Sequence, residues 1–214
     1  MASWLIHLRI ADELLKLLDI ENEEKFVVGN IAPDCGEPLP EGNYNPPTSV
    51  THWGGENYKR NIDYIGFYEK YLKDKKDDFY LGYFSHLVID YYWSHKVVIP
   101  LMGKIGIDSF SKYPEIAKKV QENWSELEER YLISHGRPKA LDILKGVDKF
   151  PNIYFDYYGK DTIENKAKFI ASCYDEPCHI TDDLSFMSEG ELEEFIEFAV
   201  DKVREIIDNN LKGQ

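Results

Sequence analysis

The residues best suited to do chemistry lie in the segment Phe79–Trp93, where His86 and Asp90 stand four positions apart. On an α-helix this spacing offsets two side chains by about 40° and about 6 Å along the axis, so both lie on one face. Gly82, one turn earlier on that face, leaves room for a close neighbour. The flanking residues are apolar or aromatic, so we expect the pair to face the interior. A buried carboxylate must be paired or must bind a metal.

Three further residues in the first part of the chain offer the same kinds of ligand. His7 lies on the apolar face of an expected helix, Asp34 follows Gly-Asn-Ile-Ala-Pro, and His52 stands in Thr-His-Trp-Gly-Gly. Neutral imidazole and carboxylate are ligands that suit zinc and related ions. His-x-x-x-Asp alone is also typical of a hydrogen bond inside a helical core, and each of the other three residues has an ordinary structural explanation. Taken together, the five residues predict a metal site.

The order and surroundings of these residues resemble those of the zinc-dependent phospholipase C family, whose fold is shared by zinc-dependent single-strand nucleases. The resemblance covers about residues 3–97 and rests on four motifs. These are His-Leu-Arg-Ile-Ala from His7, Gly-Asn-Ile-Ala-Pro-Asp ending at Asp34, Thr-His-Trp around His52, and Gly-Tyr-Phe-Ser-His-x-x-x-Asp ending at Asp90. The resemblance implies an all-α domain that holds zinc, one to three ions, and hydrolyses phosphodiesters.

The resemblance also implies a role for each residue. One zinc ion would be held by four residues: Asp34, His52, His86 and Asp90. Asp90 would also bridge towards a second ion, which His7 would help to hold. Asp34 would in addition orient or deprotonate the attacking water, which makes it the candidate catalytic residue. The family's second ion is also chelated by an N-terminal Trp freed by processing; here Trp4 is the only early Trp and three residues precede it, so this chelate requires processing.

The family has a further histidine ligand shortly after the His-x-x-x-Asp motif, and His95 follows Asp90 by five residues. His95 is nine residues beyond His86, which corresponds to about 900° on an unbroken helix. His95 would then point to the opposite face. We therefore expect His95 to join the site only if the helix bends or stops before it.

The family's last ligands are a later histidine and an acidic residue one turn beyond it. His179 is followed by Asp182 and Asp183, which fits that spacing, although Pro177 favours a loop there. His135 has Lys139 four residues on and does not fit. His179 is therefore the candidate ligand, and His135 is expected to be a surface residue.

Helical periodicity dominates the elements that must position these residues. The first helix is expected to begin after Ser3, as N-cap, and to run to about Asp19. Further helices are expected over 23–28, 58–72, 79 to the nineties, 114–134, 138–145, 162–173 and 188–209. The stretch 29–56 holds five glycines and five prolines and is expected to be a loop that carries Asp34 and His52. No segment alternates like a strand, so the predicted fold class is all-α, with residues 1–214 as a single multi-helix domain.

Composition limits the partners and the compartment. The chain has 25 Lys and Arg against 39 Asp and Glu, a formal charge of −14, which argues against an extended nucleic-acid surface because such a surface must be basic. No stretch of about 18 apolar residues predicts a transmembrane segment. Three cysteines, Cys35, Cys173 and Cys178, show no disulfide framework. Asp12 and Glu13 interrupt any signal-peptide pattern, so the expected location is cytoplasmic.

Three functional hypotheses follow from the sequence. The first is a zinc-dependent phosphodiester hydrolase of the phospholipase C type, in which a metal-activated water attacks a small phosphodiester or phospholipid-like substrate. The second is a metal-binding helical protein without hydrolase activity. The third is a metal-free helical interaction module whose histidines are buried in the core.

Overall fold

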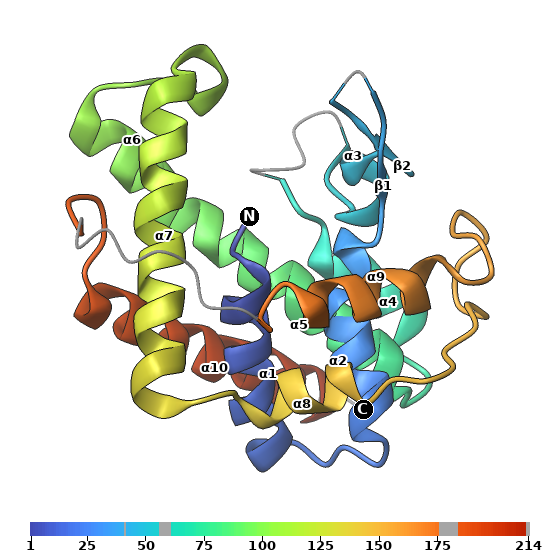
Figure 1. Ribbon diagram of the computed structural model, residues 1–214. Coiled ribbons are helices and arrows are strands. Elements are labelled where there is room, and N and C mark those ends of the chain that lie inside the picture. The colour runs from blue at the N-terminus through green and yellow to red at the C-terminus, as the bar shows by residue number, and fades with distance from the viewer. Residues whose placement is uncertain (41, 56–60, 176–183, 213–214) are drawn as a thin grey trace.

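The computed structural model of the protein describes residues 1–40, 42–55, 61–175 and 184–212 (Figure 1). These residues are predominantly helical, and their β-structure is limited to one two-stranded sheet, so the expected all-α fold class is confirmed. The elements follow in the order α1 (Trp4–Leu17), α2 (Glu23–Ile31), the 3-10 turn η1 (Ala32–Asp34), β1 (Glu37–Pro38), β2 (Tyr44–Asn45), α3 (Thr48–Thr51), α4 (Tyr64–Tyr71), α5 (Asp78–Trp93), the π-helical segment η3 (Ser94–Val98), α6 (Ile99–Ile105), the 3-10 turn η4 (Phe110–Lys112), α7 (Pro114–His135), α8 (Lys139–Lys145), α9 (Thr162–Ser172) and α10 (Glu189–Lys212).

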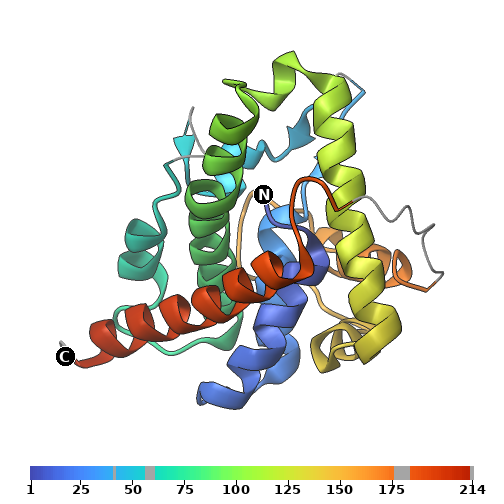
Figure 2. The ribbon, with the colours of Figure 1, turned by 90° about the vertical axis from the view of Figure 1, so that its left-hand side faces the viewer.

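Helix α1 begins where the sequence predicts. The Ser3 side chain accepts a hydrogen bond from the Ile6 backbone N–H, which caps the first turn. The apolar face of α1 is buried, and α10 packs across it (Figure 2). Arg9 of α1 is also buried, and its guanidinium pairs with Glu193 of α10 at 2.6 Å. Helix α1 is therefore fixed along its length, which holds His7 in the interior.

Helices α2 and α5 approach closely because each presents a glycine to the other. A Cβ added to Gly29 would lie 2.1 Å from the Phe79 carbonyl oxygen, and one added to Gly82 would lie 2.0 Å from the Phe26 carbonyl oxygen. The expected helix over 23–28, followed by a loop from Gly29, is too short, since α2 continues through Gly29 to Ile31. Here glycine serves close packing of two backbones and does not end the helix.

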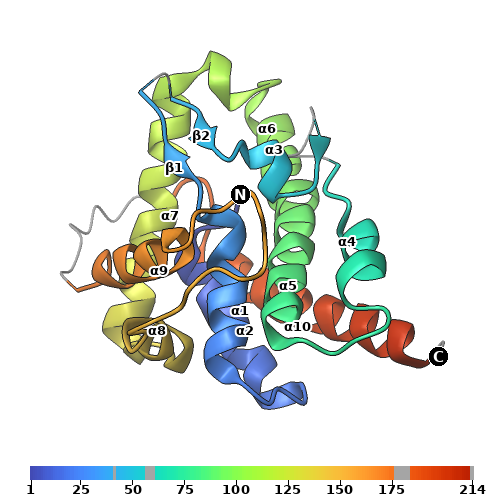
Figure 3. The ribbon, with the colours of Figure 1, turned by 90° about the vertical axis from the view of Figure 1, so that its right-hand side faces the viewer.

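The segment expected to be a loop contains a small hairpin. Strands β1 and β2 pair antiparallel, with Glu37 opposite Asn45 and Pro38 opposite Tyr44. Strands of two residues are too short to show the alternation that predicts a strand. Figure 3 shows this hairpin and α3 at the same end of the molecule as the start of α1. The hairpin thus connects the turn that carries Asp34 to the short helix that precedes His52.

Helices α5 and α6 are joined without a break by η3, so the chain is helical from residue 78 to residue 105. Helix α5 is buried along almost its whole length and begins with the Asp77 side chain capping the backbone N–H groups of Phe79 and Tyr80. No helix among the described residues combines the length and apolar character needed to cross a membrane.

Candidate metal centre

Five side chains from distant parts of the chain meet between α1, α2 and α5. They are His7 of α1, Asp34 of η1, His52 directly after α3, and His86 and Asp90 of α5. They form two overlapping groups of potential ligands, whose ligand atoms lie within 4.8 Å of one another in each group. One group contains His7, His86 and Asp90, and the other contains Asp34, His52 and His86. All five lie among the ligands that the sequence predicts.

Asp90 stands between the imidazoles with its two carboxylate oxygens facing different partners. Its Oδ1 lies 3.3 Å from His7 Nε2, whereas its Oδ2 lies 3.3 Å from His52 Nε2 and 3.5 Å from His86 Nε2. Asp34 Oδ1 lies 3.4 Å from His52 Nε2. The His7 and His86 rings are stacked at 3.8 Å between their centroids. The geometry therefore gives one carboxylate a place beside both groups of ligands.

Two of the imidazoles are oriented by hydrogen bonds on the side away from the centre. His86 Nδ1 donates to the carbonyl oxygen of Asn30 at 2.7 Å. The Thr51 hydroxyl donates to the Thr48 carbonyl oxygen, so it can accept from His52 Nδ1 at 3.0 Å. Such contacts fix the tautomer and leave the Nε2 lone pair for a metal. The two Nε2 atoms lie 3.2 Å apart, as expected of two ligands that converge on one ion.

Several buried atoms of this centre lack hydrogen-bond partners among the described residues. They are both ring nitrogens of His7 and Oδ2 of Asp90. Leaving a buried polar atom unsatisfied costs about 1–3 kcal/mol, so such atoms are rare without a reason. A bound cation would satisfy Asp90 Oδ2 and one nitrogen of His7. Imidazole and carboxylate are also the ligands typical of zinc, so the residues present fit this metal.

Two opposing effects set the pKa values in the centre. Burial disfavours the charged form of each side chain, whereas a neighbour of opposite charge favours it. Burial alone would lower the pKa of His52, but its close contacts with the Asp34 and Asp90 carboxylates raise it to about 9. Burial would raise the pKa of Asp34, but its contact with His52 and the charge of His86 bring it to about 2. For His7, burial prevails and lowers the pKa to about 4. Without a metal, His52 therefore carries a proton between two carboxylates, and an incoming cation must displace it.

Asp34 is the ligand nearest to solvent. Its side chain is 10% exposed, whereas the side chains of His7, His52, His86 and Asp90 are at most 1% exposed. The indole N–H of Trp4 donates to Asp34 Oδ2 at 2.9 Å. Trp4 thus contacts the centre through its side chain, while the backbone N–H of Ala2 donates to Asp90 Oδ1 at 2.8 Å.

The loop that carries Asp34 and His52 is held in place by tyrosines that the sequence does not single out for this role. The Tyr158 hydroxyl donates to the Ala32 carbonyl oxygen at 2.7 Å. The Tyr83 hydroxyl donates to the Thr51 carbonyl oxygen. Neither tyrosine lies in a motif that points to these contacts. Tyr83 belongs to α5, whereas Tyr158 lies in the segment between α8 and α9, which crosses α2 (Figure 3).

The structure does not bring His95 to the centre. His95 is exposed, its Nδ1 donates to the Tyr91 carbonyl oxygen at 2.8 Å, and its ring stacks on Tyr91. The chain continues through His95 as the π-helical segment η3, so the helix does not stop before this residue. His179 lies outside the described residues. His135 is exposed at the end of α7, as expected.

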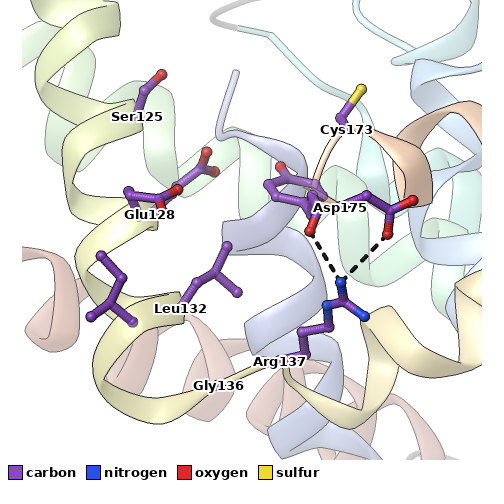
Figure 4. Close-up of a pocket in the computed structure, with 10 residues that line it drawn as sticks. Ser125, Glu128, Leu132, Gly136, Arg137, Cys173 and Asp175 are labelled. Atoms are coloured by element: carbon purple, nitrogen blue, oxygen red, sulfur yellow. Dashed lines mark hydrogen bonds and ion pairs between the residues drawn. The ribbon is translucent and has the colours of Figure 1, made fainter. Parts of the chain in front are cut away.

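A separate cavity of about 280 Å³ lies beside α7 (Figure 4). Its lining includes Glu128 and Arg137, and Arg137 forms an ion pair of 3.4 Å with Asp175. None of the five converging ligands lines this cavity. It is therefore distinct from the candidate metal centre.

Comparison with known protein families gives one match. The family model described as zinc dependent phospholipase C matches residues 6–160. No curated protein and no solved structure matches the chain. The matched range contains all five converging residues.

Proposed function

Because the chain belongs to the zinc-dependent phospholipase C family, we propose that it is a zinc-dependent phosphodiester hydrolase. The observation that carries this proposal is the convergence of three histidines and two aspartates in one buried centre. The proposed substrate is a small phosphodiester or phospholipid-like molecule. The acidic charge of −14 disfavours an extended nucleic-acid partner.

The proposed zinc ligands are His7, Asp34, His52, His86 and Asp90, for one to three ions. Bound zinc would lower the pKa of a water molecule and neutralise charge on the phosphoryl oxygens. Asp34 is the proposed catalytic residue, because it is the candidate ligand nearest to solvent. The Trp4 N–H holds Asp34 Oδ2, so the carboxylate is oriented while it accepts or directs a proton of the attacking water.

Three further parts of the proposal rest on the sequence. His179 is kept as a candidate for an additional ligand, since two aspartates follow it closely. We propose that residues 1–214 form one domain. The proposed location is cytoplasmic, because the three cysteines show no disulfide framework.

The proposed role of Asp34 is tested by Asp34→Asn in zinc-loaded protein, with bis(p-nitrophenyl) phosphate as substrate. Removing a positioned general base is expected to lower kcat by about 100-fold or more. His95→Ala is the control, and it should retain the wild-type kcat because His95 is exposed and away from the centre. An Asp34→Asn variant that binds zinc and keeps the wild-type kcat would contradict the proposed role.

One observation favours the second hypothesis, a metal-binding protein without hydrolase activity. Four of the five ligands are almost wholly buried, and closed sites are typical of structural zinc. Phosphodiester hydrolysis by the zinc-loaded wild-type protein distinguishes the hydrolase from the metal-binding protein without activity. A wild-type protein that binds zinc but hydrolyses no phosphodiester would support the structural role and contradict the hydrolase.

A further inference from the structure

Lys166 of α9 is held over aromatic rings and forms no ion pair within the part of the chain that the structure describes. Its Nζ lies 5.2 Å from the centroid of the Trp4 ring and 5.3 Å from that of Phe169. The two rings meet edge to face, 6.0 Å apart. Aromatic faces attract and position an ammonium group but do not neutralise it. Lys168, two residues further on, differs because it pairs with Glu164 at 2.8 Å.

This cation lies near Asp34, the candidate ligand whose side chain is most exposed. Trp4, whose ring Lys166 approaches, donates its indole N–H to Asp34, the ligand nearest to solvent. The charge of Lys166 also reaches the residue next to Asp34. Burial and the Asp34 charge raise the pKa of the Cys35 thiol, and the Lys166 ammonium opposes that rise. Lys166, Trp4 and Asp34 therefore lie in sequence from the half-buried edge of α9 towards the centre.

A cation at this place would attract an anionic substrate. The chain carries a net charge of −14, and the centre contains two carboxylates, Asp34 and Asp90. The overall charge of the chain repels a phosphodiester that approaches it, and the Lys166 ammonium adds a positive charge near Asp34 to that of any bound zinc. Lysine is a common phosphate ligand that acts as a point charge. Phe169 is 53% exposed and offers an apolar surface next to the ammonium.

We propose that Lys166 binds a phosphate oxygen of an anionic ester beside Asp34 of the metal centre, and that Phe169 contacts the ester's apolar group. The inference rests on the proposed function and narrows its substrate class to anionic phosphate esters with an apolar or aromatic substituent close to the phosphate. The competing explanation for the position of Lys166 is purely structural: Lys166 only packs α9 against Trp4 in the first turn of α1 and binds no ligand.

The test uses zinc-loaded full-length protein and compares Lys166→Gln with Lys166→Arg and with the control Lys168→Gln. Loss of one charge contact is expected to raise KM for bis(p-nitrophenyl) phosphate, and Kd for inorganic phosphate measured by calorimetry, by ~10-fold at low ionic strength. Zinc content and the melting temperature should stay at wild-type values. Lys166→Arg should restore binding to within ~3-fold because it keeps the charge, and Lys168→Gln should leave KM and Kd unchanged.

Three results would overturn the proposal. They are unchanged KM and Kd in Lys166→Gln, an equal effect in Lys168→Gln, or a loss of melting temperature in Lys166→Gln with no change in Kd. Phe169→Ala should raise KM for the aryl ester and leave Kd for inorganic phosphate unchanged, and a variant that changes neither would contradict the role of Phe169. The phosphate Kd is measured without turnover. A wild-type protein with no activity would therefore refute the proposed hydrolase, while the Kd would still decide the role of Lys166.

Discussion

At the scale of single residues, two features define the candidate metal centre. The two carboxylate oxygens of Asp90 face different histidines, and His52 carries a proton when no metal is bound. Asp90 faces His7 with one oxygen and both His52 and His86 with the other. His52 lies between Asp90 and Asp34, and these contacts raise its pKa to about 9. A cation that binds here replaces the proton of His52 as the partner of the two carboxylates.

This exchange predicts how zinc binding depends on pH. Between pH 9 and pH 7, the metal-free protein holds a proton on His52 that zinc must displace, so zinc affinity should fall as the pH falls, by about tenfold per unit. Calorimetry in buffers of different ionisation enthalpy should show release of about one proton per zinc bound at pH 7. Zinc affinity that is equal at pH 7 and pH 9, with no proton release, would contradict this arrangement.

Glu128 of α7 is a second titrating group, away from the ligands. Its carboxylate accepts a hydrogen bond from the Ser3 hydroxyl, and burial raises its pKa from 4.5 to about 7. A raised folded-state pKa contributes stability below pH 4.5 that is lost as the pH rises through about 7.

Glu128→Gln should therefore become more stable relative to wild type as the pH rises. One pKa unit corresponds to about 1.4 kcal/mol, so the difference in free energy of unfolding between variant and wild type should grow by roughly 1–3 kcal/mol from pH 4.5 to pH 8. Urea unfolding with chelator present measures this without contributions from the metal. An equal difference at both pH values would show that Glu128 does not titrate as described.

At the scale of elements, the centre depends on the closeness of α2 and α5. Helix α2 supplies Asn30, whose carbonyl oxygen orients His86, and it leads directly into the turn that carries Asp34. The two glycines between these helices are what permits the approach. A change in their spacing would displace ligands from both groups.

Gly82→Ala should therefore lower both the free energy of unfolding and the amount of zinc that the protein binds. The added methyl would lie 2.0 Å from the Phe26 carbonyl oxygen, and forcing two backbones apart is expected to cost about 3 kcal/mol. Gly103→Ala in α6 is the matched control, because nothing lies within 4 Å of its added Cβ. This control should leave the free energy of unfolding unchanged or raise it by up to ~1 kcal/mol. Chemical denaturation of both variants measures these effects, and equal stability of the two would refute the role of the close contact.

Local sequence patterns predict most of these elements but not their contacts. Ser3 as the N-cap of α1 and the apolar face that buries His7 follow from residue type and periodicity. The close packing of Gly29 against α5 could not be predicted. In sequence, a glycine that ends a helix looks the same as one that packs against another backbone. The β1–β2 hairpin is too short to show a period.

At the scale of the whole molecule, the acidic chain concentrates five candidate metal ligands in one buried centre. The convergence of these five residues could be predicted because imidazole and carboxylate are visible as residue types and their motifs keep a recognisable order. The contacts of Trp4 with Asp34 and of Tyr158 with Ala32 could not, because they depend on tertiary packing between distant segments. His95 shows that spacing along the chain does not replace the angle around a helix axis.

Zinc content per chain tests the central claim most directly. Elemental analysis should be made on wild type, His86→Ala and His95→Ala, each purified without chelator and then loaded with zinc. We predict at least one zinc per wild-type chain, a loss in His86→Ala because His86 belongs to both groups of ligands, and the wild-type content in His95→Ala. Wild-type protein without zinc, or His86→Ala with the full wild-type content, would contradict the account.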